Sequence, residues 1–154
     1  IMAGGTPESF ERARPVLKEL GGNVTLMGSV GAGQTTKVIN QAIVGTGFVL
    51  MAEAVRLAEA SGIDAARLPT CLAGGFADSE LLRRLYPRIA ARAFEPPAAY
   101  ARQLLKDLAA VEAFAVSCGC RLPLVTAARE RYARYVADGN AFADSASLIN
   151  LYER

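Results

Sequence analysis

The feature that most limits how this chain can fold is an uncharged, apolar run over residues 38–52. It lies inside a longer segment, residues 34–61, which Gly62 follows, and this pattern predicts one helix of roughly 40 Å at 1.5 Å per residue. Because the run is apolar on nearly every side, we expect its surface to be mostly covered. It is shorter than the roughly 20 residues of a membrane span and contains Asn40 and Gln41. We therefore expect a buried helix and no membrane segment.

Shorter elements flank this helix on both sides. Residues 1–3 and 24–27 are typical of short strands, and Thr6 followed by Pro7 marks the start of a helix between them. Glycine and proline separate the later helical segments, residues 64–72, 79–93, 98–117, 123–137 and 144 onward. Two strands alone make no stable sheet, so we expect residues 1–30 to be the end of a larger α/β domain and residues 31–154 to form an all-helical domain. The predicted fold class is mainly α, a helical bundle around one long central helix, with a short α/β remnant at the N-terminus.

The composition excludes several kinds of site. The chain has no histidine, which rules out a Ser-His-Asp triad, a Cys-His pair and any histidine-bearing zinc site within it. Lys and Arg exceed Asp and Glu by 17 − 15 = 2 and are scattered, so no nucleic-acid groove is expected. The three cysteines cannot complete a four-cysteine zinc site, and we expect no metal. We expect them to be small, reduced fillers, which suits the cytoplasm.

A glycine-rich segment, residues 28–33, leads into the long helix. It is not a phosphate-binding P-loop, because Gln34 and Thr35 stand where Lys and Ser or Thr are required. It is not the dinucleotide fingerprint either, because Thr36 replaces the third glycine. What remains is a turn in which the backbone can approach a ligand, so Gly33 is a candidate substrate-binding residue. The alternative interpretation is a plain tight turn.

Lys37 is the more informative residue, because it is the only charged residue between Glu19 and Glu53. It lies one turn into an apolar helix, where burial and the positive end of the helix dipole would both favour the neutral amine. A lysine of this kind suits proton transfer near neutral pH. Asn40 and Gln41 follow at i+3 and i+4, so the three side chains share one helix face. The alternative is a structural lysine that extends to solvent beside two amides in a helix contact.

Together these residues carry a resemblance to a known family. The spacing of Gly28, Gly31, Gly33, Lys37 and Asn40, followed by a long helix, resembles the start of the C-terminal domain of the β-hydroxyacid dehydrogenases. That family includes 3-hydroxyisobutyrate, tartronate semialdehyde and 6-phosphogluconate enzymes. Three further segments agree with the family in order and distance, residues 74–79, 105–108 and 144–153. The resemblance covers essentially the whole chain, with the opening strand and helix corresponding to the end of the family's cofactor domain.

The resemblance implies a role for each candidate site residue. Lys37 would be the general acid/base of a hydride transfer that uses NAD or NADP, and Asn40 would orient the substrate. Lys106 matches the lysine that approaches the bound cofactor. Gln41 stands where many members have a second Asn and would also contact substrate, which is closer to the tartronate semialdehyde reductase branch. We expect the cofactor to be held mainly by the family's N-terminal Rossmann domain, which this chain lacks.

The sequence thus predicts the C-terminal part of an NAD(P)-dependent 3-hydroxyacid dehydrogenase or reductase, inactive as this chain alone. Its partners would be a small hydroxy acid or semialdehyde substrate and further copies of itself, in a homodimer or higher homo-oligomer, because a few short helices cannot cover the long one. One alternative is an oxidative decarboxylase of the 6-phosphogluconate type. Another is an imine reductase, against which Lys37 argues. The third is a non-enzymatic helical dimerisation module.

Overall fold

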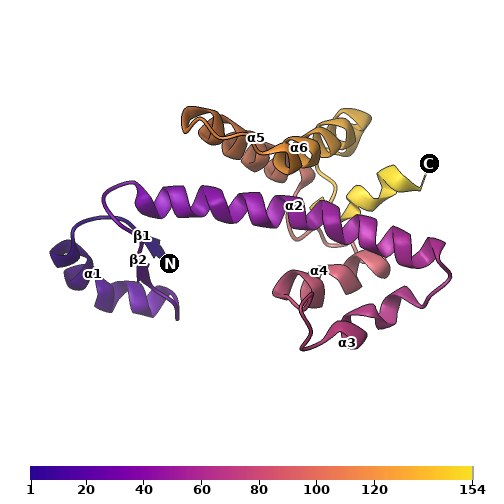
Figure 1. The fold of residues 1–154 in the computed structure, drawn as a ribbon, viewed down its shortest axis with the longest axis horizontal. Coiled ribbons are helices and arrows are strands. Elements are labelled where there is room, and N and C mark those ends of the chain that lie inside the picture. Colours follow the sequence, from indigo (N-terminus) through magenta and orange to yellow (C-terminus); the bar gives the residue numbers. More distant parts are fainter. Residues whose placement is uncertain (154) are drawn as a thin grey trace. The chain divides into compact units, whose positions relative to one another are not determined.

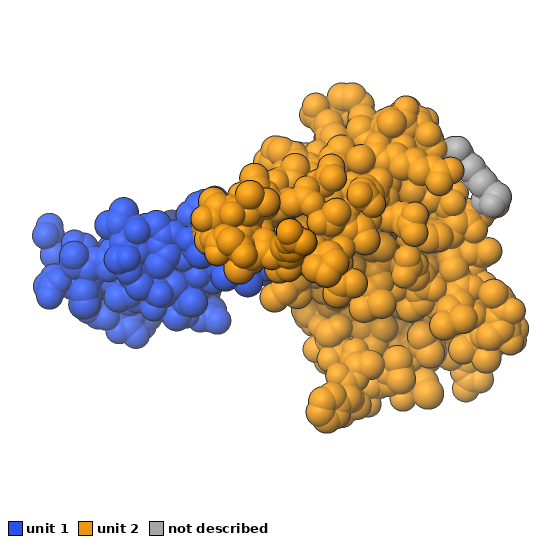
Figure 2. All heavy atoms as spheres, turned by 45° about the horizontal axis from the view of Figure 1, so that its top comes forward, with its two compact units in different colours: residues 1–41 blue, residues 42–154 orange. Residues whose placement is uncertain are grey.

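The computed structural model describes residues 1–153. These residues group into two compact units, residues 1–41 and residues 42–153 (Figure 2). The first unit holds β1 (Met2–Ala3), α1 (Pro7–Leu20) and β2 (Thr25–Leu26). The two strands are parallel, with Met2 opposite Thr25. The predicted strand–helix–strand segment is therefore confirmed. The predicted domain boundary at residue 30 stays a prediction.

Local chemistry explains where α1 begins. The hydroxyl of Thr6 accepts a hydrogen bond from the Ser9 N–H at 3.2 Å, and Pro7 occupies the first helical position, where its missing N–H costs nothing. Within the part of the chain that the structure describes, no residue of α1 is buried, and Val16 and Leu20 are exposed. The apolar face of α1 is thus left largely uncovered by this chain.

The long helix is α2 (Ala32–Ala60), which begins two residues before the predicted start and ends one residue before the predicted end (Figure 1). Two glycines lie inside it where side chains of other helices come close. A Cβ on Gly45 would lie 2.5 Å from a methyl carbon of Leu108, and one on Gly47 would lie 2.6 Å from a methyl carbon of Leu81. Close helix packing is the usual reason for glycine inside a helix, and here it applies at both positions.

Shorter helices complete the second unit. They are η1 (Ala65–Arg67), α3 (Leu68–Leu72), α4 (Glu80–Ala90), α5 (Ala101–Ser117), α6 (Pro123–Tyr135), η2 (Val136–Asn140) and η3 (Ser145–Tyr152). The prediction of a mainly α fold is confirmed. Two details differ from the sequence pattern: η2 is a π-helical turn in which Gly139 has a φ of 92°, and η3 is a 3₁₀ helix and not an α-helix.

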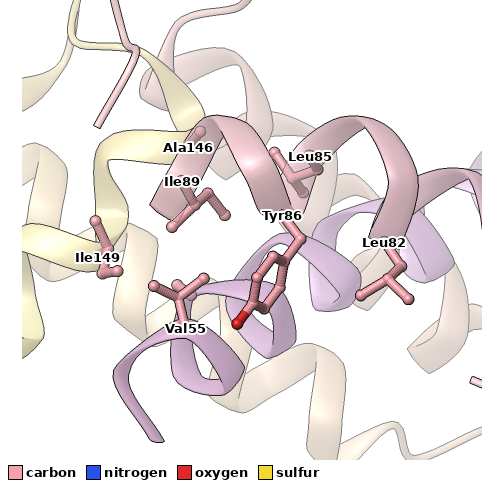
Figure 3. Packing of buried hydrophobic residues seen from close by; sticks show 8 residues of the cluster. Val55, Leu82, Leu85, Tyr86, Ile89, Ala146 and Ile149 are labelled. Atoms are coloured by element: carbon pink, nitrogen blue, oxygen red, sulfur yellow. The ribbon is translucent and has the colours of Figure 1, made fainter. Parts of the chain in front are cut away.

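The core lies where α2, α4 and η3 meet, and Figure 3 shows its side chains at close range. The buried cluster consists of Ala52, Val55, Leu82, Leu85, Tyr86, Ile89, Ala146 and Ile149. Each large aliphatic or aromatic side chain removed from water contributes about 1.5–3 kcal/mol. The C-terminal half of α2 is therefore the part that the short helices hold.

A carboxylate and a tyrosine fix η3 to the helices around it. Asp144 is 3% exposed and caps η3 by accepting the Ala146 N–H at 2.7 Å, as its position before an apolar helix predicts. Tyr152 donates its hydroxyl to Glu53 of α2 at 2.9 Å. Burial, followed by this hydrogen bond, raises the pKa of Tyr152 to about 12. The end of the chain is thus tied to the long helix.

Much of α2 nevertheless remains exposed, so the prediction of a helix buried on most sides is wrong for the single chain. Only 28% of its most apolar stretch is buried, and Ile39, Ile43, Leu50 and Leu57 are all more than half exposed. By length and composition alone, α2 would suffice to cross a membrane, a property that core helices of water-soluble proteins share. The short helices of one chain do not cover it.

Candidate active site

The candidate site begins at the turn from β2 into α2. Gly28 and Gly31 have φ values of 143° and 95°, in the region that favours glycine. The backbone of the first strand holds this turn in place: the Met27 N–H donates to the carbonyl of Ala3 at 2.8 Å, and the Gly5 N–H donates to the carbonyl of Gly28 at 2.9 Å. The start of α2 is therefore fixed against β1.

Gly33 has a packing reason to be glycine. It is buried, and a Cβ there would collide with the carbonyl oxygen of Met2 and approach the backbone of Ala3 to 3.0 Å. These are backbone atoms, which cannot rotate away as a side chain can. This contact supports the alternative interpretation of a tight turn. Substrate binding at Gly33 stays a prediction, and it would have to use the backbone.

Lys37, Asn40 and Gln41 do converge, as their spacing predicts. The Lys37 Nζ donates to the side-chain oxygen of Gln41 at 2.7 Å, and the Asn40 amide donates to the same oxygen at 3.0 Å. All three come from the first three turns of α2. The Lys37–Gln41 contact follows from helix geometry, because residues four apart are neighbours on the helix surface. Asn40 reaches the same oxygen from the adjacent position in the sequence.

The surroundings of Lys37 differ from the prediction in one respect. The sequence suggests a desolvated lysine, but Lys37 is exposed in this chain, with Asn40 and Gln41 half-buried. Its neighbours on the helix leave one side open to solvent. The hydrogen bond to Gln41 joins the ammonium to a neutral amide oxygen, which orients the amine without a carboxylate's negative charge. The arrangement leaves the Lys37 nitrogen able to meet a ligand from outside.

Lys106 lies on α5, in the second compact unit. Its side chain is 78% exposed, and its ammonium pairs with the Asp107 carboxylate at 3.2 Å. An exposed pair of this kind contributes little to stability. Lys106 is thus available to a ligand, and its contact with a cofactor stays a prediction.

Cavities and cysteines add nothing to this site. Three cavities of about 500, 710 and 170 Å³ in the described chain have none of the predicted site residues in their walls. Cys71, Cys118 and Cys120 are free, which agrees with the expected reduced state, but all three are exposed, so the expectation that they act as fillers is wrong. Within residues 1–153, no three His, Cys, Asp or Glu side chains are placed to hold a metal ion.

One exposed residue escaped the sequence analysis. Phe76 is fully exposed on the loop between α3 and α4. In the sequence it is only part of a glycine-rich segment that resembles the family, and no local pattern distinguishes an exposed phenylalanine from a buried one. Its position became informative only with the structure.

The elements that carry the candidate site are a pair of parallel strands, a glycine turn, and a long helix whose first turns hold a lysine and two amides. Residues 31–152 match the family model described as "NAD-binding of NADP-dependent 3-hydroxyisobutyrate dehydrogenase". The chain belongs to this family of NAD(P)-dependent β-hydroxyacid dehydrogenases, as the resemblance in its motifs predicts.

Individual relatives agree with the family match. A 2-hydroxy-3-oxopropionate reductase of Escherichia coli is 35% identical over 99% of this chain and 52% of its own length. The structure of Mycobacterium tuberculosis 3-hydroxyisobutyrate dehydrogenase with L-serine superimposes with a TM-score of 0.85 at 28% identity, over 98% of this chain and 54% of that one. The structure of a Salmonella typhimurium 3-hydroxyisobutyrate dehydrogenase superimposes with a TM-score of 0.87 at 26% identity, over 97% of this chain and 53% of that one. The chain thus spans about half the length of the relatives it matches.

Proposed function

We propose that the chain is the C-terminal part of an NAD(P)-dependent 3-hydroxyacid dehydrogenase or reductase that works in the cytoplasm. Its substrate would be a small hydroxy acid or the corresponding semialdehyde. The observation that carries this proposal is the cluster of Lys37, Asn40 and Gln41 at the start of α2 in a chain of this family. The relatives support the substrate class, since 2-hydroxy-3-oxopropionate is a semialdehyde and serine is a 3-hydroxy acid.

The cofactor would be a nicotinamide dinucleotide, which supplies or accepts the hydride. The side chains present fit such a ligand, because the exposed Lys106 ammonium can face a ribose or phosphate oxygen. The glycine turn lacks the dinucleotide fingerprint, so we assign most of the nucleotide's binding to the other half of the whole protein. In that arrangement this chain contributes the proton-transfer group and one cofactor contact.

Lys37 would handle the proton in both directions. During reduction its ammonium protonates the alkoxide that develops as the substrate carbonyl receives hydride, and during oxidation the neutral amine removes the hydroxyl proton. Asn40 would donate its amide to the substrate. Gln41, whose oxygen lies 2.7 Å from the Lys37 Nζ, holds the amine on this face of the helix. Because Lys37 is exposed here, water must be excluded by the substrate and the cofactor-binding half when the site closes.

We also propose that the protein is a homodimer or a higher homo-oligomer. The exposed residues Ile43, Leu50 and Leu57 lie along α2 and form an apolar surface that the single chain leaves in water. Large contiguous patches of this kind mark interaction sites. This surface also keeps a dimerisation module as a second candidate function, which would leave Lys37 without a role in turnover.

Substitution of Lys37 in the complete protein tests the function. Lys37→Ala should lower kcat by about 10²–10⁴, the usual contribution of general acid–base catalysis. Lys37→Arg should restore little, because a guanidinium does not release its proton near neutral pH. Both variants should bind nicotinamide cofactor normally and unfold within about 0.5 kcal/mol of the wild type, since Lys37 is exposed. Steady-state kinetics, a cofactor titration and a thermal melt measure these three quantities.

The matched control is Lys18→Ala, which removes an exposed lysine from the end of α1 and should leave kcat unchanged. If Lys37→Ala keeps more than about a tenth of the wild-type kcat, Lys37 is not the general acid/base. Carbon dioxide release that accompanies NAD(P) reduction would instead identify the oxidative decarboxylase. A complete protein without a dinucleotide-binding sequence before residue 1 would favour the dimerisation module.

A further inference from the structure

One of the cavities in this chain is an open groove in the second unit. It has a volume of about 710 Å³ and is bounded by α2, α3, α4 and α6. Its walls are mainly aliphatic and include Ile43, Leu50, Leu68, Leu72, Leu81 and Leu124. Of these, Leu50 and Leu124 are 59% and 77% exposed. The groove is therefore a hydrophobic concavity that this chain does not fill.

A hydrophobic projection lies directly beside this groove. Phe76 is fully exposed, at 113% of its reference area, on the loop that joins α3 to α4. The next residue, Ala77, and Ser79 of the same loop are part of the groove wall. The projection and the groove therefore lie on the same face of the second unit.

The loop that carries Phe76 is held in shape by hydrogen bonds on both sides of the ring. The Asp78 carboxylate accepts the Gly74 N–H at 2.8 Å and pairs with Arg83 at 3.1 Å. The Ser79 hydroxyl accepts the Leu82 N–H at 3.1 Å, which caps α4. A ring presented on a fixed loop loses little conformational entropy on binding, which is the property of an anchor residue in an interface.

The charges in the groove are also mutually complementary. Glu53 of α2 and Arg131 of α6 are both in its wall, one acidic and one basic, and within this chain both contact the Tyr152 hydroxyl. In a two-fold symmetric interface, the same patch meets itself, so residue i of one copy contacts residue j of the other and the reverse. A patch that contains a projection, a recess, an acid and a base on one face satisfies that requirement. A lipid surface would need none of these paired features.

We infer that a second copy of this chain covers the groove and that Phe76 of each copy inserts into the groove of the other. The inference specifies the contact in the proposed homodimer and is independent of the chemistry assigned to Lys37. It predicts a direct contact between Phe76 and groove residues such as Leu50 and Leu124.

A photo-crosslinking experiment tests the contact in the wild-type background. Phe76 is replaced by the photoreactive residue p-benzoylphenylalanine, and the variant is mixed with an isotopically labelled wild-type chain before irradiation. The expected products are crosslinks between unlabelled and labelled chains that map to residues 43–54 or 124–131. Crosslinks that map elsewhere, or no crosslink between chains, would overturn the inference.

A thermodynamic test uses Phe76→Ala, with Phe142→Ala as the matched control, since Phe142 is a second phenylalanine that is 63% exposed. Burial of a phenylalanine ring is worth at least about tenfold in affinity, and a symmetric dimer buries two. Sedimentation at several concentrations should show the dimer weakened by about 100-fold for Phe76→Ala and unchanged for Phe142→Ala. Circular dichroism confirms that each variant is folded.

The double variant Phe76→Ala with Leu124→Ala separates a direct contact from an indirect effect. If the ring packs on Leu124, the two losses in affinity should not add, because the contact is removed by either change. Additive losses, or a dimer that Phe76→Ala leaves intact, would refute the insertion while leaving the proposed enzyme unaffected. Binding of the chain to lipid vesicles that Phe76→Ala abolishes would instead make this face a membrane surface.

Discussion

At the scale of single residues, the Asp144 carboxylate is a buried charge that depends on several hydrogen-bond partners. It is 3% exposed and accepts the Ala98 N–H at 2.6 Å, the Ala146 N–H at 2.7 Å and the Arg88 guanidinium at 2.8 Å. The carboxylate thereby joins α4, the segment before α5, and η3. Its charge is matched by Arg88, which is itself only partly exposed.

Replacing Asp144 by Asn should therefore destabilise the fold by about 2–3 kcal/mol, because Arg88 loses its counter-charge and one backbone N–H loses a charged acceptor. Urea unfolding followed by circular dichroism measures the change. The control is Asp64→Asn, which alters the exposed cap of η1, where the Asp64 carboxylate accepts the Ala66 N–H at 3.0 Å. Since Asn caps helices as well as Asp, that variant should change stability by less than about 0.5 kcal/mol. Equal effects of the two substitutions would contradict the role given to Arg88.

The candidate site shows what residue spacing can and cannot predict. The contact between Lys37 and Gln41 follows from helix periodicity, and so does the position of Asn40 on the same face, which is why the sequence was sufficient to predict that face. The burial of Lys37 could not be predicted in the same way. An apolar helix indicates only that something covers it, and in this chain nothing described covers Lys37. Whether a side chain is desolvated depends on tertiary and quaternary contacts that a local pattern does not contain.

At the scale of elements, the two glycines of α2 offer a matched comparison. Alanine at either position should gain about 1 kcal/mol in helix propensity. At Gly45 the new methyl group meets Leu108, which is fully buried and has no room to move, so we expect a net loss of about 1–2 kcal/mol. At Gly47 it meets Leu81, which is only half-buried at the edge of the groove and can rotate, so we expect stability to be unchanged or slightly higher.

Thermal unfolding of Gly45→Ala and Gly47→Ala at one protein concentration gives the comparison. If both substitutions stabilise the protein, helix propensity outweighs packing and the close approach of α5 to α2 is not what requires glycine at position 45. If both destabilise it equally, Leu81 is held as firmly as Leu108. Only the unequal result agrees with the packing described above.

Most elements agree with their sequence signals, and the exceptions have physical causes. Thr6 with Pro7, Ser79 and Asp144 each precede a helix and each cap it through a side chain or a proline, so those starts are encoded locally. The 3₁₀ form of η3 and the π-turn of η2 have no such signal. Around η3 the Tyr132 hydroxyl donates to the carbonyl of Ser145 at 2.8 Å, and in η2 Gly139 takes a φ of 92°. Tertiary contacts there decide among helix types that a periodic sequence allows equally.

At the scale of the whole molecule, the exposed face of α2 is the property that a single chain leaves unexplained. Ile43, Leu50 and Leu57 expose 62%, 59% and 72% of their area. If a second copy covers this face, folding is coupled to association, and the stability must rise with protein concentration. Each tenfold increase in concentration then adds about 1.4 kcal/mol per dimer, which corresponds to roughly 2 °C in Tm for a dimer of this size.

Calorimetry over a hundredfold range of concentration should therefore show the Tm rising by roughly 4 °C. Leu50→Glu places a charge on the exposed face of α2 and should remove the dependence, leaving a lower Tm that is the same at every concentration, because a buried unpaired carboxylate prevents association. Leu20→Glu is the control, because Leu20 is 74% exposed at the end of α1 and does not belong to the long helix. This variant should keep the wild-type dependence of Tm on protein concentration. A wild-type Tm independent of concentration, with light scattering that reports a monomer at micromolar concentration, would show that the chain tolerates this apolar face in water.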